Sequence, residues 1–249
     1  MKKISIVTGA LITLLLASIS SLAQVQSRAD ILKQIEAKRQ ELDALEIQFL
    51  SPSEEDQTTY AEFLRQPDTG LIRLLPREKF ESEVHKNNKK GVTLRGGGAY
   101  YSFSRLTHEY GFGSDISLEQ DYLSTGFAGA NYGILTSIGN TPLENVSLAT
   151  AAAQLLAEHV PPSEEPKARI EQRKWSNGEI VDGTSYRNRL LIKVNETYLV
   201  RSIDYGTSDV LVAFRVVRVD TDESAVILWK LLKKYPKPHL ARNESSIRD

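Results

Sequence analysis

The sequence of 249 residues contains no cysteine. Disulfide bonds and cysteine-based zinc sites are therefore excluded, and four histidines are too few to favour a metal site built from several imidazoles. A chain of this length buries enough apolar surface to fold without such crosslinks. We therefore expect a conventional hydrophobic core, with no metal and no other cofactor.

Neither sign of charge is in excess. The chain has 31 basic and 32 acidic residues, and the two signs are interspersed. This balance provides no broad positive field that would attract nucleic acid. We therefore expect no nucleic-acid partner.

The N-terminal apolar run is too short for a membrane span. Ile4 to Ile19 covers 16 residues, whereas a spanning helix needs about 20. Lys2 and Lys3 precede this run, and Ser21-Leu22-Ala23 follows it with small-x-small spacing. This order predicts a secretory signal peptide over residues 1–23. We expect an exported protein, periplasmic or extracellular, with no stable membrane anchor after cleavage.

Residues 24–80 are predicted to form a helical N-terminal arm. Its first helix should span 27–50, with Ser27 as the N-cap. Apolar residues recur along this helix at spacings of three, four or seven: Leu32, Ile35, Leu42, Leu45 and Phe49. The stripe fits two alternatives, a helix packed on its own domain or a coiled coil with a partner. A second, shorter helix should begin after Ser53.

Residues 91–238 are predicted to form a β-rich domain, and 239–249 a polar tail. The domain should comprise a glycine- and aromatic-rich half (91–140), one helix (147–160) and an antiparallel meander (173–235). Residues 163–167 should form a loop, and Asn177-Gly178 a hairpin turn. Residues 210–219 are apolar on both faces, which is typical of a central strand. The predicted class is α+β, with a helical arm followed by a mostly antiparallel sheet domain containing one inserted helix.

The densest group of polar residues suggests one set of catalytic candidates. His108 would be the base, Ser114 the nucleophile, and Glu109 or Asp115 the orienting carboxylate. Alternation along a strand places His108 and Glu109 on opposite faces, which argues against both entering one pocket. The alternative is that these are ordinary residues at the end of a strand.

Aromatic residues concentrate between positions 100 and 132, and three of them are candidates for a ligand-binding platform: Tyr101, Tyr110 and Tyr132. Flat aromatic rings beside polar residues bind sugars and peptides. The alternative is packing in the core, since strand alternation turns about half of such residues inward.

No motif specifies a chemistry, so three functions remain open. The first is a non-catalytic binding or structural module of the bacterial envelope or medium, with a glycan, peptide or protein as ligand. The second is an envelope hydrolase that uses His108 with Asp115 or Glu109. The third is an assembly protein that oligomerises through the helix 27–50.

Overall fold

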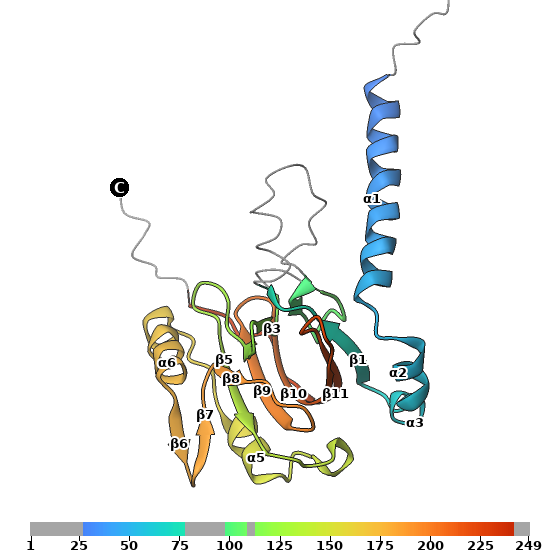
Figure 1. The fold of residues 1–249 in the computed structure, drawn as a ribbon. Helices are drawn as coiled ribbons and strands as arrows, with labels where there is room; N and C mark the ends of the chain where they lie inside the picture. The colour runs from blue at the N-terminus through green and yellow to red at the C-terminus, as the bar shows by residue number, and fades with distance from the viewer. Residues whose placement is uncertain (1–26, 78–97, 109–112, 242–249) are drawn as a thin grey trace, which may run out of the picture. The chain divides into compact units, whose positions relative to one another are not determined.

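The computed structural model describes residues 27–77, 98–108 and 113–241 (Figure 1). The expected signal peptide over 1–23 lies outside these residues, as do Glu109 and Tyr110. Contacts divide the chain into two compact units, Met1–Leu45 and Glu46–Asp249, which are described separately.

The described part of the first unit consists of one helix. Helix α1 spans Arg28–Leu50, which confirms the prediction, and extends into the second unit. Ser27 caps it, because its Oγ accepts the backbone N–H of Asp30 at 3.1 Å. All five side chains of the predicted stripe are exposed: Leu32, Ile35, Leu42, Leu45 and Phe49.

The second unit begins with two short helices and an edge strand. Helix α2 spans Glu54–Thr59, α3 spans Ala61–Leu64 and β1 spans Thr69–Leu74. Ser53 caps α2 as predicted, since its Oγ accepts the backbone N–H of Asp56 while the Asp56 carboxylate accepts the backbone N–H of Ser53. This reciprocal arrangement is a capping box.

A five-stranded antiparallel sheet forms the centre of the unit. Its order is β1-β11-β10-β9-β5, where β5 spans Tyr132–Ser137, β9 Thr197–Asp204, β10 Ser208–Val219 and β11 Ala225–Lys234. β10 is the central strand, and its first seven residues are buried. Apolar side chains on both of its faces therefore have neighbours to pack against, which confirms the prediction for 210–219.

One face of this sheet packs against a second antiparallel sheet. The second sheet has the order β2-β3-β4-β8, where β2 spans Tyr100–Tyr101, β3 Ile116–Glu119, β4 Tyr122–Ser124 and β8 Arg189–Leu191. The shared core includes Phe103, Ile116 and Leu123 from the second sheet's segment and Phe214 and Trp229 from the large sheet. The α+β class with mostly antiparallel sheets is thus confirmed.

Helices pack against the opposite face of the large sheet. They are α5, which spans Ala151–Glu158, and α6, which spans Glu165–Asn177. Leu156 of α5 and Trp175 of α6 join Leu199 and Leu211 of the sheet in a second core. A short 3-10 helix, η2 (Leu143–Asn145), adds Leu143 to that core.

Two sequence predictions in this region are wrong in detail. The helix predicted over 147–160 is the shorter α5, because 147–150 form a turn in which Ser147 N–H donates to Thr150 Oγ1 at 3.1 Å. In the loop predicted over 163–167, residues 165–167 instead form the first turn of α6, so two α-helices are inserted in the sheet region rather than one.

The hairpin lies a few residues beyond its predicted position. Asn177 ends α6, and Gly178 follows with a φ of 88° as its C-cap. The turn is instead Asp182-Gly183, with φ values of 49° and 77°, between β6 (Glu179–Val181) and β7 (Thr184–Tyr186). Two consecutive positive φ values match the type I′ turn that closes two-residue hairpins.

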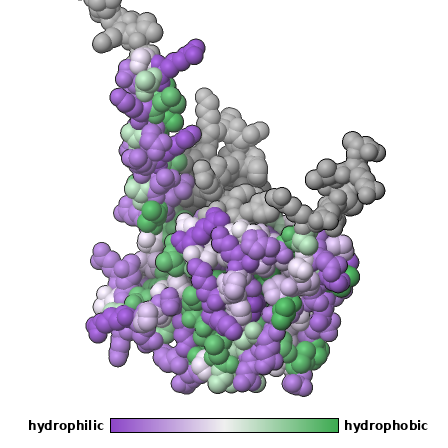
Figure 2. Space-filling model, turned by 180° about the vertical axis from the view of Figure 1, so that it is seen from behind, coloured by the Kyte–Doolittle hydropathy of each residue, from purple (hydrophilic) through white to green (hydrophobic). Residues whose placement is uncertain are grey.

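The surface seen in Figure 2 is mainly hydrophilic, with hydrophobic residues in small groups. No helix in the described part of the chain is long and apolar enough to cross a membrane.

Candidate functional site

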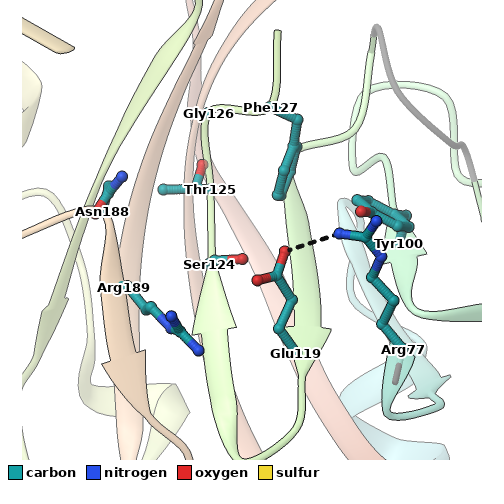
Figure 3. Close-up of a pocket in the computed structure, with 9 residues that line it drawn as sticks. All are labelled: Arg77, Tyr100, Glu119, Ser124, Thr125, Gly126, Phe127, Asn188 and Arg189. Atoms are coloured by element: carbon teal, nitrogen blue, oxygen red, sulfur yellow. Dashed lines mark ion pairs between the residues drawn. The ribbon is translucent and has the colours of Figure 1, made fainter. Parts of the chain in front are cut away.

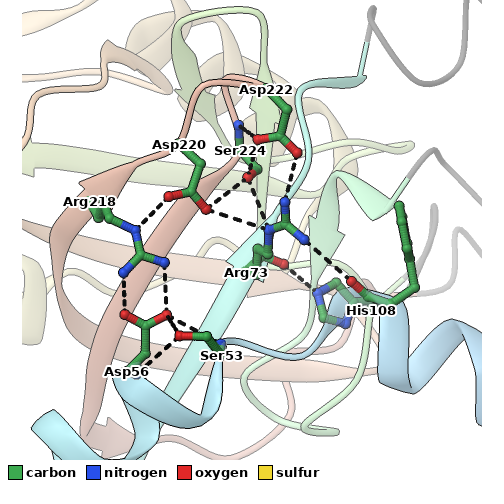
Figure 4. Close-up of polar contacts among 9 residues, drawn as sticks. Ser53, Asp56, Arg73, His108, Arg218, Asp220, Asp222 and Ser224 are labelled. Atoms are coloured by element: carbon green, nitrogen blue, oxygen red, sulfur yellow. Dashed lines mark hydrogen bonds and ion pairs between the residues drawn. The ribbon is translucent and has the colours of Figure 1, made fainter.

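The predicted base, His108, is engaged by backbone. Its Nε2 lies 2.8 Å from the carbonyl oxygen of Arg73 (Figure 4), and its ring packs edge-on against Tyr101 with 5.3 Å between centroids. A carbonyl only accepts, so Nε2 carries the proton in this contact. Burial lowers the pKa of His108 and favours the neutral imidazole.

The predicted orienting carboxylate, Asp115, is bound to a different segment. Its side chain is fully buried, and its Oδ2 accepts the backbone N–H of Phe103 at 2.6 Å. Burial raises the pKa of Asp115 to about 6, and the neighbouring charge of Asp204 adds to the rise. Ser114 is buried beside it. The hydrogen bonds of His108 and Asp115 therefore go to separate backbone groups, and the geometry gives no argument for a catalytic pair.

The two predicted platform tyrosines in the described residues are both buried. Tyr101 packs edge-on against Phe103, with 5.3 Å between ring centroids. Tyr132 packs under the helices, and its hydroxyl lies 2.7 Å from His159 Nε2. Neither ring is available as a surface platform, because alternation turns both into a core.

A cluster of paired arginines joins α2 to the turn between β10 and β11 (Figure 4). We call it the arginine clasp; it comprises Asp56, Arg73, Arg218, Asp220 and Asp222. Arg218 donates two hydrogen bonds to the Asp56 carboxylate, of which Nη2 to Oδ2 measures 2.8 Å. Its Nε lies 2.5 Å from Asp220 Oδ1, and Arg73 Nη2 lies 2.7 Å from Asp222 Oδ2.

The clasp has the properties of a structural element. Each of its guanidinium groups meets at least one carboxylate, so little charge is left for a ligand. Arg218 holds the pKa of Asp56 below its ordinary range, chiefly through their hydrogen bond. Since α2 and the turn are about 160 residues apart in the sequence, the clasp closes a long loop of chain.

A cavity of about 520 Å³ opens beside the second sheet (Figure 3). We call it the first cavity. It combines charged, polar and aromatic side chains: Arg77, Tyr100, Glu119, Ser124, Thr125, Phe127, Asn188 and Arg189. Asn188 and Arg189, at the start of β8, lie on one side, and Arg77, Tyr100 and Phe127 lie on the other (Figure 3).

The aromatic wall depends on a glycine. Tyr100 and Phe127 meet edge-to-face with 5.1 Å between ring centroids. Gly126, just before Phe127, has a φ of 82°, and a Cβ there would lie 2.8 Å from the backbone Cα of Tyr132. Only glycine fits this tight turn, which directs the Phe127 ring toward the cavity.

The polar wall is a chain of hydrogen bonds and one ion pair. Ser124 Oγ lies 2.8 Å from Ser117 Oγ, and Ser117 Oγ donates to Glu119 at 3.3 Å. Glu119 in turn lies 3.7 Å from an Arg77 nitrogen (Figure 3). The Arg77 charge is therefore partly compensated.

Arg189 differs from Arg77 because it has no carboxylate partner among the described residues. Its guanidinium carbon lies 4.1 Å from the centre of the Tyr122 ring. This cation–π contact orients the planar group without neutralising it. An oriented, exposed guanidinium at the edge of a cavity is a ready site for a carboxylate or phosphate.

Neither Arg77 nor Arg189 was predicted as a site residue. The available signal was the presence of two like charges, Arg187 and Arg189, two positions apart in the sequence. The sequence does not show which arginines are paired, since those partners come from distant segments.

No metal site emerges from the described ranges: they contain no group of three or more histidine and carboxylate side chains placed to hold an ion.

Comparisons with family models, curated proteins and solved structures give no match to this chain.

Proposed function

We propose that this chain is a non-catalytic binding module and that the first cavity binds a small anionic ligand. The single observation that carries the proposal is the exposed Arg189 guanidinium, which is oriented by Tyr122 and has no carboxylate partner in the described chain. A guanidinium in this state gains from a bound anion without first breaking an internal ion pair.

The rest of the lining suits a ligand with a ring or apolar body. The half-buried Phe127, with the buried Tyr100 packed edge-on against it, offers apolar contact surface on one side, and Ser124 and Asn188 offer polar groups on the other. The cavity of about 520 Å³ lies within the range of small-molecule sites. A ring-bearing carboxylate matches both sides.

Isothermal titration calorimetry with galacturonate, inorganic phosphate and neutral galactose tests the proposal. We expect the anions to bind and galactose not to bind. Arg189→Gln should weaken binding about ten-fold or more, since a hydrogen bond between charged groups contributes about 1.5–3 kcal/mol. The matched control is Arg169→Gln on α6, an exposed arginine paired with Glu165 at 2.6 Å. Equal binding by R189Q and R169Q would refute the site.

We further propose that the protein is exported. Residues 1–23 support this, because two lysines are followed by an apolar run and then by small residues at a cleavage-site spacing. Mass spectrometry of the protein from cell fractions tests this directly. We expect a chain beginning at Gln24 in the periplasm or medium, and an intact Met1 in the cytosol would contradict it.

A second candidate function is assembly through α1. Ile35, Leu42 and Phe49 recur every seven residues on this helix and are exposed, which favours pairing with another copy. Sedimentation of the chain and of its Leu42→Glu variant distinguishes the cases. A dimer that Leu42→Glu converts to a monomer supports assembly, and a monomer in both cases excludes it.

A further inference from the structure

We infer that the ligand is an acidic oligosaccharide that occupies two adjacent cavities, with Arg189 between them. This inference rests on the proposed function and specifies its ligand. It is carried by a second cavity, by the charges that line both cavities and by the position of two unpaired arginines.

A second cavity shares one lining side chain with the first. It has a volume of about 320 Å³ and is lined by Tyr122, Arg187, Arg189, Lys193 and Glu196, among others. Arg189 belongs to both cavities, and Tyr122, which stacks on its guanidinium, belongs to the second. Arg189 can therefore be reached from either cavity.

The charges that line the two cavities do not balance. There are four cations, Arg77, Arg187, Arg189 and Lys193, and two carboxylates, Glu119 and Glu196, which leaves an excess of two positive charges. The carboxylates are already engaged, since Glu119 lies 3.7 Å from Arg77 and Glu196 lies 3.5 Å from Lys193.

The excess charge resides on Arg187 and Arg189. Neither has a carboxylate partner among the described residues; the Arg187 guanidinium donates a long hydrogen bond of 3.5 Å to the carbonyl oxygen of Asn177. Both side chains line the second cavity, so two positive charges lie in one site. Like charges placed in this way repel each other. A ligand with at least two anionic groups would offset the repulsion.

The shape and chemistry of the lining favour linked sugars. A chain of uronic acid units presents a carboxylate on each ring, so it can place anions near both arginines while its rings fill both cavities. Phe127 and Tyr122 supply aromatic surface, and Ser137 and Asn188 supply polar groups along the path. A nucleic acid is less suitable, because the chain as a whole has a net charge of −1 and no broad basic field.

Calorimetry with galacturonic acid and its linear trimer tests the inference. We expect the trimer to bind at least ten-fold more tightly than the monomer. Arg187→Gln should remove most of the trimer's advantage, Arg189→Gln should weaken both ligands, and Arg169→Gln should change neither. Added salt should weaken the trimer more than the monomer, because more charges are involved. Arg187 and Arg189 are exposed, so variants at these positions should fold. Circular dichroism of each variant checks that it does.

The possible failures are distinct. If the monomer binds at Arg189 but the trimer binds no more tightly, the two-cavity inference is overturned and the proposed function stands. If poly-glutamate or single-stranded DNA binds more tightly than the trimer, the ligand class is wrong. If none of the anions binds, the proposed function itself fails.

Discussion

The arginine clasp and the pair Arg187 and Arg189 use the same side chain in opposite ways. In the clasp, Arg73 pairs with Asp222 and Arg218 pairs with Asp56. These ion pairs neutralise both arginines and connect β1 and α2 to the β10–β11 region. In the cavities, Arg187 and Arg189 have no carboxylate partner within the described ranges. The difference shows that the role of an arginine depends on what the fold brings to it. The predictions below test that contrast.

Arg201 is a further case, an arginine that is completely buried together with its carboxylate partner. Arg201 is 1% exposed; its Nε and Nη2 lie 2.5 and 2.9 Å from the Asp209 carboxylate, and its Nη1 donates to the Leu156 carbonyl oxygen. Arg201→Ala would leave Asp209 buried without a cation. We expect a loss of about 3–5 kcal/mol in the free energy of unfolding, measured by urea denaturation. A loss below 1 kcal/mol would contradict this assignment.

A substitution in the arginine clasp should lower the free energy of unfolding by less than Arg201→Ala does. Arg218→Gln removes the bidentate partner of Asp56, a mostly buried carboxylate, but Arg218 itself is 44% exposed and its attraction is screened. We therefore expect a loss of about 1 kcal/mol at neutral pH.

Arg218→Gln should also change how the free energy of unfolding depends on pH. The native pKa of Asp56 is lowered, so its contribution is present above the unfolded pKa and is lost as the pH falls through the native value. Urea unfolding at pH 7 and pH 3 should show a smaller loss on acidification in Arg218→Gln than in the parent. An identical pH dependence in the two proteins would argue against the clasp.

Asp115 provides the complementary case, a buried carboxylate that has no arginine partner in the part of the chain that the structure describes. Its native pKa is raised to about 6, so the folded state holds its proton more tightly than the unfolded state does. The sign is therefore reversed: stability contributed by this group rises as the pH falls from 7 to 5, by about 1 kcal/mol. Asp115→Asn should flatten this part of the profile in thermal or urea unfolding. A steeper profile in the variant would disprove the assignment.

The smallest effect on stability should come from the unpaired arginines. Arg187→Gln and Arg189→Gln remove no ion pair within the described residues, and both side chains are exposed. We expect changes within about 0.5 kcal/mol in the free energy of unfolding. A loss as large as that of Arg218→Gln would mean that these residues are structural after all.

The parts of the fold that follow local patterns were predictable. Helix α1 has a cap and an apolar repeat within its own sequence, and the strands β9, β10 and β11 are β-branched runs separated by short polar turns. Helix α6 was missed, because it is largely polar and ends at Asn177-Gly178. That dipeptide suits a hairpin turn, but a glycine with positive φ equally ends a helix.

The candidate site was less predictable. Tyr101 and His108 have residue types suited to binding or catalysis, yet the former is buried and the latter is bonded to a backbone carbonyl. Phe127 enters a cavity because Gly126 permits a turn against Tyr132, a contact that spans two segments. Residue type alone therefore pointed to side chains that the assembled sheets bury or engage with backbone groups.

By itself, the sequence determined the cysteine-free α+β architecture, the long N-terminal helix and the central apolar strand, because periodicity, capping and turn chemistry act between neighbours in the chain. Only the tertiary structure decided which arginines are neutralised and which remain open to a ligand. Arg73 and Arg218 each have a carboxylate partner about 150 residues away or more, Asp222 and Asp56, whereas Arg187 and Arg189 have no carboxylate partner in the described chain. The electrostatics of a side chain depend on distances in space, which no local pattern encodes.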